Sequence, residues 1–166
     1  FKRDYVRWFA LFVDSSIYIY VYFLMMILDK LEGKKIILAS QSPRRQELLR
    51  GIGIDFEVLV KDNIDEDFDA QMPFAQVAEY LASKKAQAYT DTITESTIII
   101  TADTIVCTDN EILNKPSNEA EAKYMLNQLS GKKHKVITGV CLKSINKEVL
   151  FSSESVVYFA NLEQSE

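Results

Sequence analysis

Residues 97–108 read TIIITADTIVCT, a β-branched run with one carboxylate, Asp103, near its middle. A continuous run of this kind predicts a central strand that is covered on both faces of a sheet. An aspartate in such a strand needs a partner, a metal or a catalytic role, because an unpaired buried charge costs several kcal/mol. The alternative is a structural aspartate that ends the strand and bonds to neighbouring backbone amides. The strand pattern alone leaves both roles open.

The chain before this run predicts alternating strands and helices. Residues 36–40 and 54–60 read as strands, and residues 43–50 read as a short helix between them. Residues 61–72 are acidic and loop-like, and Pro73 then opens a longer helix. The apolar stripe expected to face the core from this helix consists of Phe74, Val77, Ala78, Leu81, Ala82, Ala86 and Tyr89.

The chain after the run continues the pattern. Residues 112–113 read as a short return strand, Asn118 caps a helix that ends at Leu129, and residues 136–144 and 149–162 read as paired strands. The residues of this helix expected to face inward are Ala122, Met125, Leu126 and Leu129. The order predicts an α/β domain with a mixed sheet. Because the chain ends directly after a strand, we expect the domain to be incomplete at its C-terminus.

Composition limits the function classes. A chain of 166 residues with 48% hydrophobic and 26% charged residues predicts one soluble domain. The net charge of −5 disfavours sequence-independent binding to nucleic acid. Cys107 and Cys141 lie in strand-like runs without a CxxC partner, which indicates a reducing, cytoplasmic compartment. The single histidine, His134, forms no zinc motif with them at a recognised spacing.

Residues 1–32 form an apolar extension ahead of a domain predicted over residues 33–166. Residues 8–28 carry one charge and are long enough to span a membrane. Residue 1 is not methionine, however, and Met25 and Met26 stand just ahead of the first predicted strand. We therefore expect residues 1–24 to be non-native or upstream-derived sequence, with a native start at Met25 or Met26. A membrane anchor is the less favoured alternative.

The segment Ser40 to Arg45 reads SQSPRR, where a predicted strand ends and a predicted helix begins. Free backbone N–H groups and the helix dipole favour an anion at such a place. Arg44 and Arg45 add planar donors that match phosphate oxygens. The alternative is a solvated basic first turn with an ordinary cap.

Two adjacent lysines lie on different faces of the helix that Pro73 opens. Lys85 follows Leu81 by four residues and therefore lies on the apolar stripe, whereas Lys84 points about 100° away. Lys85 either snorkels or reaches into a cleft. We expect Lys84 to be exposed and its replacement by alanine to be nearly neutral. One carboxylate of the acidic loop could also bind a divalent cation that bridges phosphates.

Five ordered segments resemble motifs of the Maf family and together span nearly all of residues 36–162. The segments SQSPRRQELL, LASKKA, TADTIV and NKP resemble its S-x-S-P-R-R-x-E-L-L, L-A-x-x-K-A, G-A-D-T-V-V and G-K-P. Residues 129–140 resemble its L-S-G-x-x-H-x-V-x-T-G-V. The resemblance implies a twisted mixed sheet flanked by helices, as in inosine triphosphatases, with a cleft between two lobes. It also implies metal-dependent hydrolysis of nucleoside triphosphates to monophosphate and pyrophosphate, which cleans nucleotide pools.

The resemblance also implies roles for single residues. Asp103 matches the family's proton acceptor, and Glu66 matches a residue expected to bind Mg²⁺ or Mn²⁺. The residues expected to bind substrate are Ser40, Arg44, Arg45, Lys85, Thr104 and Lys115. Among these, Arg45 and Thr104 match the branch that acts on dTTP and UTP. The alternatives are a 7-methyl-GTP pyrophosphatase and a non-catalytic, nucleotide-binding regulator of septum formation; homodimer formation is left open.

The sequence departs from the family pattern at two places. Thr101 stands where the family usually has glycine, for which we expect a modest steric consequence. The family's C-terminal K-A-G-x-Y-x-x-Q segment does not occur in residues 1–166. The lysine and glutamine of that segment belong to the same cleft in the family.

Overall fold

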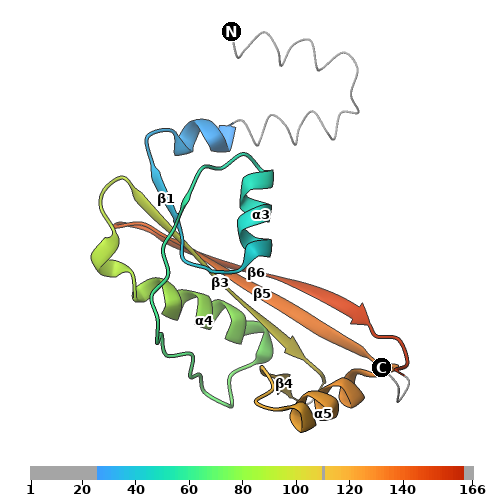
Figure 1. Cartoon of the computed structure of the whole chain (residues 1–166). Helices are drawn as coiled ribbons and strands as arrows, with labels where there is room; N and C mark the ends of the chain where they lie inside the picture. Colours follow the sequence, from blue (N-terminus) through green and yellow to red (C-terminus); the bar gives the residue numbers. More distant parts are fainter. Residues whose placement is uncertain (1–25, 110, 163–166) are drawn as a thin grey trace, which may run out of the picture.

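The computed structural model describes residues 26–109 and 111–162. Its central element is one mixed β-sheet (Figure 1). The strand order is β2-β1-β3-β5-β6, and β4 pairs with β3 off this path. The strands are β1 (Lys35–Leu38), β2 (Glu57–Val58), β3 (Thr97–Cys107), β4 (Ile112–Leu113), β5 (Lys133–Lys143) and β6 (Glu148–Tyr158). Strands β2, β1 and β3 run parallel, whereas β4 and β5 pair antiparallel with β3, and β6 pairs antiparallel with β5. The predicted mixed sheet is confirmed.

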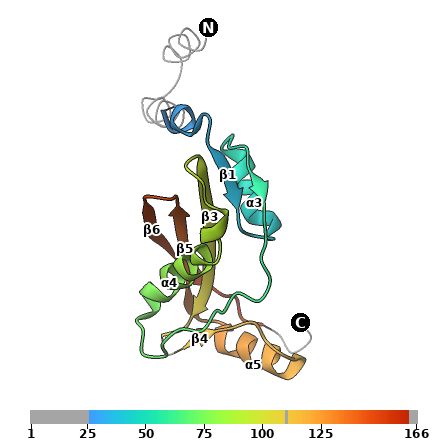
Figure 2. The ribbon, with the colours of Figure 1, turned by 90° about the vertical axis from the view of Figure 1, so that its left-hand side faces the viewer.

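Helices flank the twisted sheet, which confirms the predicted α/β class (Figures 1 and 2). The helical elements are α3 (Pro43–Gly51), α4 (Phe74–Gln87), the short 3₁₀ turn η1 (Thr90–Thr92) and α5 (Glu119–Leu129). Helix α4 packs on β3 and β5, and α3 lies beside β1. The predicted cap of α5 is confirmed, because the Asn118 side chain accepts a hydrogen bond from the Glu121 N–H.

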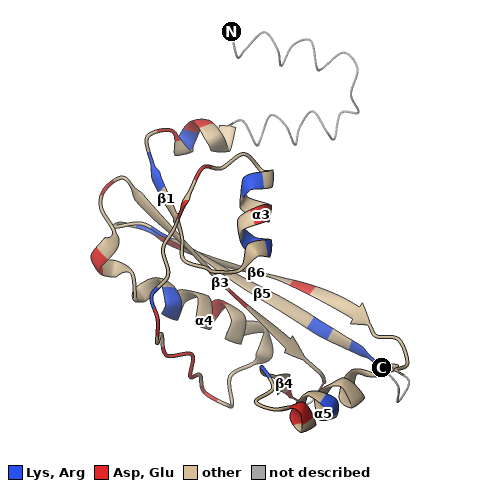
Figure 3. Cartoon of the chain, viewed as in Figure 1, with Lys and Arg blue, Asp and Glu red and all other residues tan. Residues whose placement is uncertain are grey.

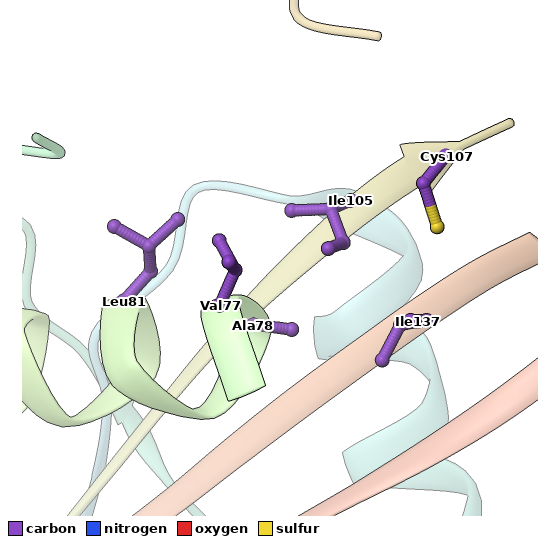
Figure 4. Packing of buried hydrophobic residues seen from close by; sticks show 6 residues of the cluster. All are labelled: Val77, Ala78, Leu81, Ile105, Cys107 and Ile137. Atoms are coloured by element: carbon purple, nitrogen blue, oxygen red, sulfur yellow. The ribbon is translucent and has the colours of Figure 1, made fainter. Parts of the chain in front are cut away.

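The apolar stripe of α4 forms the main core. Val77, Ala78 and Leu81 pack against Ile105 and Cys107 of β3 and Ile137 of β5 (Figure 4). Removing this apolar surface from water is the main force that holds the helix on the sheet. The predicted stripe is confirmed at these positions.

The residue that replaces the family's glycine joins this helix to the sheet. The Thr101 side chain is fully buried, and its hydroxyl donates a 2.6 Å hydrogen bond to the Ala82 carbonyl of α4. A buried hydroxyl without a partner would be destabilising, so this bond makes threonine acceptable here. The modest steric effect expected from the sequence is therefore accompanied by a specific contact between β3 and α4.

Gly139 of β5 sits against the backbone of α4. A β-carbon at this position would overlap the Ala78 carbonyl group and the Glu79 nitrogen. Since these are main-chain atoms, neither can turn away as a flexible side chain could. The absence of a side chain at Gly139 therefore lets the helix backbone rest directly on the strand.

Gly139→Ala should accordingly lower the free energy of unfolding by about 3 kcal/mol, because overpacking against backbone forces the helix away from the sheet. Urea denaturation measures this change. Gly51→Ala is the matched control, because a β-carbon at Gly51 meets nothing within 4 Å. Equal stability of the two variants would contradict the close approach.

Three predicted elements differ from the structure. Residues of β3 alternate between buried and half-buried or exposed positions because α4 covers one face only, so the prediction of a strand covered on both faces is wrong. The strand predicted over residues 54–60 shrinks to β2, because β1 ends at Leu38 and offers no longer partner. Helix α5 has no buried residue, and Leu126 is 43% exposed, because the helix lies at the end of the sheet near β4 (Figures 1 and 2).

Both cysteines are free and buried, as predicted. Burial raises the pKa of the Cys141 thiol to about 11 and also raises that of Cys107. Both thiols are therefore protonated at neutral pH and pack as small apolar groups.

The apolar extension predicted for residues 1–32 lies outside the described residues up to position 25, and residues 26–31 are helical. No helix in the described ranges is long and apolar enough to cross a membrane.

Candidate active site

A cleft of about 940 Å³ opens between α4, the loop of residues 61–72 and the end of β3 beside β4. It brings together seven residues predicted as site residues, namely Ser40, Arg45, Glu66, Lys85, Asp103, Thr104 and Lys115. A second hollow of about 340 Å³ adjoins it and shares Ser40, Arg45, Glu66, Lys85 and Lys115. The seven residues come from five separate segments of the chain, and the fold brings these segments together.

Lys85 stands at the centre of the polar part of the cleft. Its ammonium lies 2.5 Å from Asp103 Oδ1 and 2.8 Å from Glu66 Oε1. The side chains of Lys85 and Asp103 are only 17% and 13% exposed, whereas that of Glu66 is 56% exposed. The helical stripe explains this position of Lys85. Of the two alternatives that the sequence left open for Lys85, the structure shows the one in which it reaches into a cleft.

The contacts between Lys85 and the two carboxylates stabilise the charged forms of Lys85 and Glu66. The hydrogen bond from Lys85 lowers the pKa of Glu66, and the positive charges of Lys85 and Lys115 lower it further. Burial lowers the pKa of Lys85, but its hydrogen bonds to Asp103 and Glu66 outweigh burial and leave the pKa raised. At neutral pH, Glu66 is therefore ionised and Lys85 is protonated.

Arg45 binds the rim of the cleft from the first turn of α3. Its guanidinium donates three hydrogen bonds: one of 2.9 Å to the Ala102 carbonyl, one of 3.1 Å to Thr104 Oγ1 and one of 3.4 Å to Ser40 Oγ. Ser40 is buried, and its hydroxyl also accepts a 3.2 Å hydrogen bond from the Ser42 N–H. The Ser42 side chain makes no cap bond, so the start of α3 is held by Ser40 and by Pro43 in the first turn.

Arg44 is the one predicted substrate residue outside this group. It is exposed and does not line either hollow. Adjacent positions of a helix point about 100° apart, so Arg45 and Arg44 cannot both face β3. A role for Arg44 in binding substrate stays a prediction.

The structure overturns the expectation that Lys84 is a free surface residue. Its ammonium lies 2.6 Å from Asp65 Oδ2 and 2.7 Å from the Asp67 carbonyl oxygen. The predicted direction of the Lys84 side chain is confirmed, because Lys84 points away from the apolar stripe of α4. The acidic loop, however, passes beside that flank of α4, as the red segments of the loop in Figure 3 show.

Sequence reasoning missed Thr138 and the apolar part of the cleft. Thr138 lies opposite Thr104 in the β3–β5 register, and their hydroxyl oxygens are 3.0 Å apart. Phe68 and Ile112 line the cleft from the loop and from β4. The signal for Thr138 is its place in the β5 motif, but the register that brings it to Thr104 is a property of the folded sheet.

Glu66 and Asp103 are the carboxylates that fit a divalent cation. Each contacts the Lys85 ammonium through one oxygen, and each carboxylate has a second oxygen that a cation could bind. Mg²⁺ commonly binds proteins through one or two carboxylates and takes its other ligands from substrate phosphates and water. Among the described residues no group of three or more histidine, cysteine or acidic side chains could hold a metal.

The family model described as Maf-like protein matches residues 35–166, which include every residue of the cleft. The chain belongs to the Maf-like family. A dTTP/UTP pyrophosphatase of Phocaeicola vulgatus is 46% identical over 140 residues, which cover 84% of this chain and 72% of that protein. A dTTP/UTP pyrophosphatase of Parabacteroides distasonis gives the same identity and coverage. The predicted family is confirmed.

The fold of this Maf-like chain also has a solved counterpart. The Ham1 protein of Staphylococcus aureus superposes with a TM-score of 0.51 at 14% identity, over 75% of this chain and 71% of that one. At this identity the likeness concerns the fold alone. It agrees with the twisted mixed sheet described above.

Proposed function

We propose that this Maf-like protein hydrolyses dTTP and UTP to the nucleoside monophosphate and pyrophosphate, and so cleans nucleotide pools. The observation that carries the proposal is the convergence of Lys85, Glu66 and Asp103 within one cleft, with contacts of 2.5 and 2.8 Å. The two named relatives support the choice of substrates, because each is a dTTP/UTP pyrophosphatase.

The cationic residues of the cleft neutralise the triphosphate. The cationic side chains of Lys85, Arg45 and Lys115 all line the cleft. A triphosphate repels an attacking hydroxide, so placing fixed cations around its oxygens lowers the barrier. Lys85 uses two of its three N–H donors in the contacts above, and its third is available to a phosphate oxygen.

Asp103 serves as the general base. Its carboxylate takes one proton from a water molecule while the water oxygen forms a bond to the α-phosphorus. The bond between the α-phosphorus and the bridging oxygen to the β-phosphorus breaks, and pyrophosphate leaves with that oxygen and the electron pair. The hydrogen bond from Lys85 keeps the Asp103 carboxylate oriented toward the cleft.

Mg²⁺ or Mn²⁺ is the proposed cofactor, held by Glu66 and by the substrate phosphates. The bound cation supplies Lewis-acid neutralisation of phosphate charge. Asp103 is the alternative ligand, because it shares the same ammonium with Glu66. The exposed Glu66 carboxylate is better placed to meet a cation from solvent, whereas Asp103 is nearly buried.

The pair Arg45 and Thr104 is proposed to select the nucleotide. The guanidinium and the hydroxyl are bonded at 3.1 Å on the rim of the cleft, and Thr138 supports Thr104 from β5. The apolar residues Phe68 and Ile112 line the same cleft and can receive the base or sugar.

Pyrophosphate release measured across a panel of nucleotides tests the proposal. We expect turnover of dTTP and UTP at least about tenfold above that of GTP, ATP and 7-methyl-GTP, because binding contacts of this kind discriminate by this order. A preference for 7-methyl-GTP would place the chain in the alternative branch. Nucleotide-dependent thermal stabilisation without pyrophosphate release would instead favour the non-catalytic regulator.

A further inference from the structure

Lys84 contacts the acidic loop on both sides of Glu66. Its ammonium donates to the Asp65 carboxylate at 2.6 Å and to the Asp67 carbonyl at 2.7 Å. The other Asp65 carboxylate oxygen accepts the Asp67 N–H at 2.8 Å. Asp65 and Asp67 are the two sequence neighbours of Glu66. The three hydrogen bonds therefore link Lys84 to the residue before Glu66 and to the residue after it.

Adjacent lysines on α4 thus bind adjacent carboxylates on the loop. Lys84 forms an ion pair with Asp65, and Lys85 forms one with Glu66, each with an ammonium–carboxylate distance below 3 Å. Other anchors of the loop lie on either side of this segment. Lys61 donates from its backbone to the Tyr89 hydroxyl, Ile64 packs on the cluster of Ile37, Tyr89 and Ile99, and Phe68 packs on the main core. Among the described side chains, Lys84 is the one that binds both neighbours of Glu66.

We propose that Lys84 is a positioning residue, which holds the segment Asp65–Asp67 so that Glu66 faces the cleft. An exposed ion pair alone contributes little to stability, but two charge-assisted bonds from one donor fix the path of the backbone. The Lys84 side chain is 23% exposed, although Asp65 is 62% exposed, so the ammonium lies against the loop. This inference rests on the proposed function, because it takes Glu66 as the metal ligand.

Lys84→Ala should weaken Mn²⁺ binding about tenfold, since loss of a residue that orients a metal ligand costs at least this much. Calorimetry of the whole chain with Mn²⁺ and a non-hydrolysable dTTP analogue, which supplies the phosphate ligands, measures the Mn²⁺ dissociation constant without reference to turnover. The Mn²⁺ concentration that half-activates pyrophosphate release should rise by a similar factor, while kcat at saturating Mn²⁺ stays within about twofold. Hydrogen exchange of residues 62–68 should become faster in the variant.

Two further variants separate positioning from charge. Lys123→Ala removes one positive charge and one ion pair, with Glu119, on α5 and should leave both the Mn²⁺ affinity and the loop unchanged. Lys84→Arg can still donate to both Asp65 and Asp67 and should restore most of the lost affinity.

Equal Mn²⁺ affinity and equal loop exchange in Lys84→Ala and Lys123→Ala would overturn the inference. A wild-type chain that releases no pyrophosphate would overturn the proposed function instead. In that case Mn²⁺ binding and loop exchange still decide whether Lys84 positions Glu66.

Discussion

Asp103→Asn should lower the kcat for dTTP by at least about 100-fold, because asparagine keeps the shape of the side chain but cannot accept the proton of the attacking water. Nucleotide binding should persist or strengthen, since the variant removes a negative charge from a cleft that receives a triphosphate. Pyrophosphate release measures the first effect, and calorimetry with dTTP measures the second.

The competing role for Asp103 is that of a structural partner for Lys85, with which it shares a 2.5 Å contact. A purely structural aspartate would give a variant with a lower melting temperature and near-normal kcat. That result would remove Asp103 from the chemistry, because loss of stability and loss of turnover would then be separate effects. Thermal denaturation of the same preparation provides the comparison.

Lys85→Ala should lower kcat/KM for dTTP by about 100-fold, through both a higher KM and a lower kcat, because a largely buried cation stabilises charge in the ground state and more strongly in the transition state. The loss should shrink little when salt is added, since the Lys85 side chain is only 17% exposed and salt screens buried charges weakly. The variant also removes the hydrogen bond that lowers the pKa of Glu66. Steady-state kinetics at low and high salt measure both expectations.

Lys123→Ala is the control for net charge in this experiment, because Lys123 is exposed on α5 and pairs only with Glu119 among the described residues. It should leave kcat and KM within about twofold, as exposed substitutions usually do. The neighbouring Lys84 is unsuitable as a control because it binds the loop that carries Glu66. Equal losses from Lys85→Ala and Lys123→Ala would mean that Lys85 does not act in the cleft.

Local periodicity predicted the parts of the site that belong to regular elements. The 3.6-residue repeat of α4 was enough to place Lys85 on the face that meets the sheet. The carboxylate inside the β-branched run was enough to single out Asp103. Both residues lie in the cleft, because the sequence neighbours of each residue fix the direction of its side chain. Their roles in the chemistry stay predictions.

The loop of residues 61–72 shows what periodicity leaves open. It has no repeat, so its five acidic residues look alike in the sequence. Only its passage along α4 distinguishes Glu66, which meets Lys85, from Asp65, which meets Lys84. The choice of Glu66 depended on the family motif, and the contact of Lys84 was missed. The Thr104–Thr138 contact was missed for a similar reason, since strand register depends on residues far apart in the chain.

The backbone contact at Gly139 bears on which substitutions the core can accept. Gly139 pairs with Asp103 in the sheet, and Ala78, which it touches, lies two helical turns before Lys85 on the same helix face. The backbone of α4 therefore lies directly on the backbone of β5 near the Lys85–Asp103 pair. The distance between α4 and the sheet depends little on side-chain size at this point. Volume-conserving changes at Val77, Leu81 or Ile137 should thus alter stability while leaving the distance between ammonium and carboxylate nearly constant.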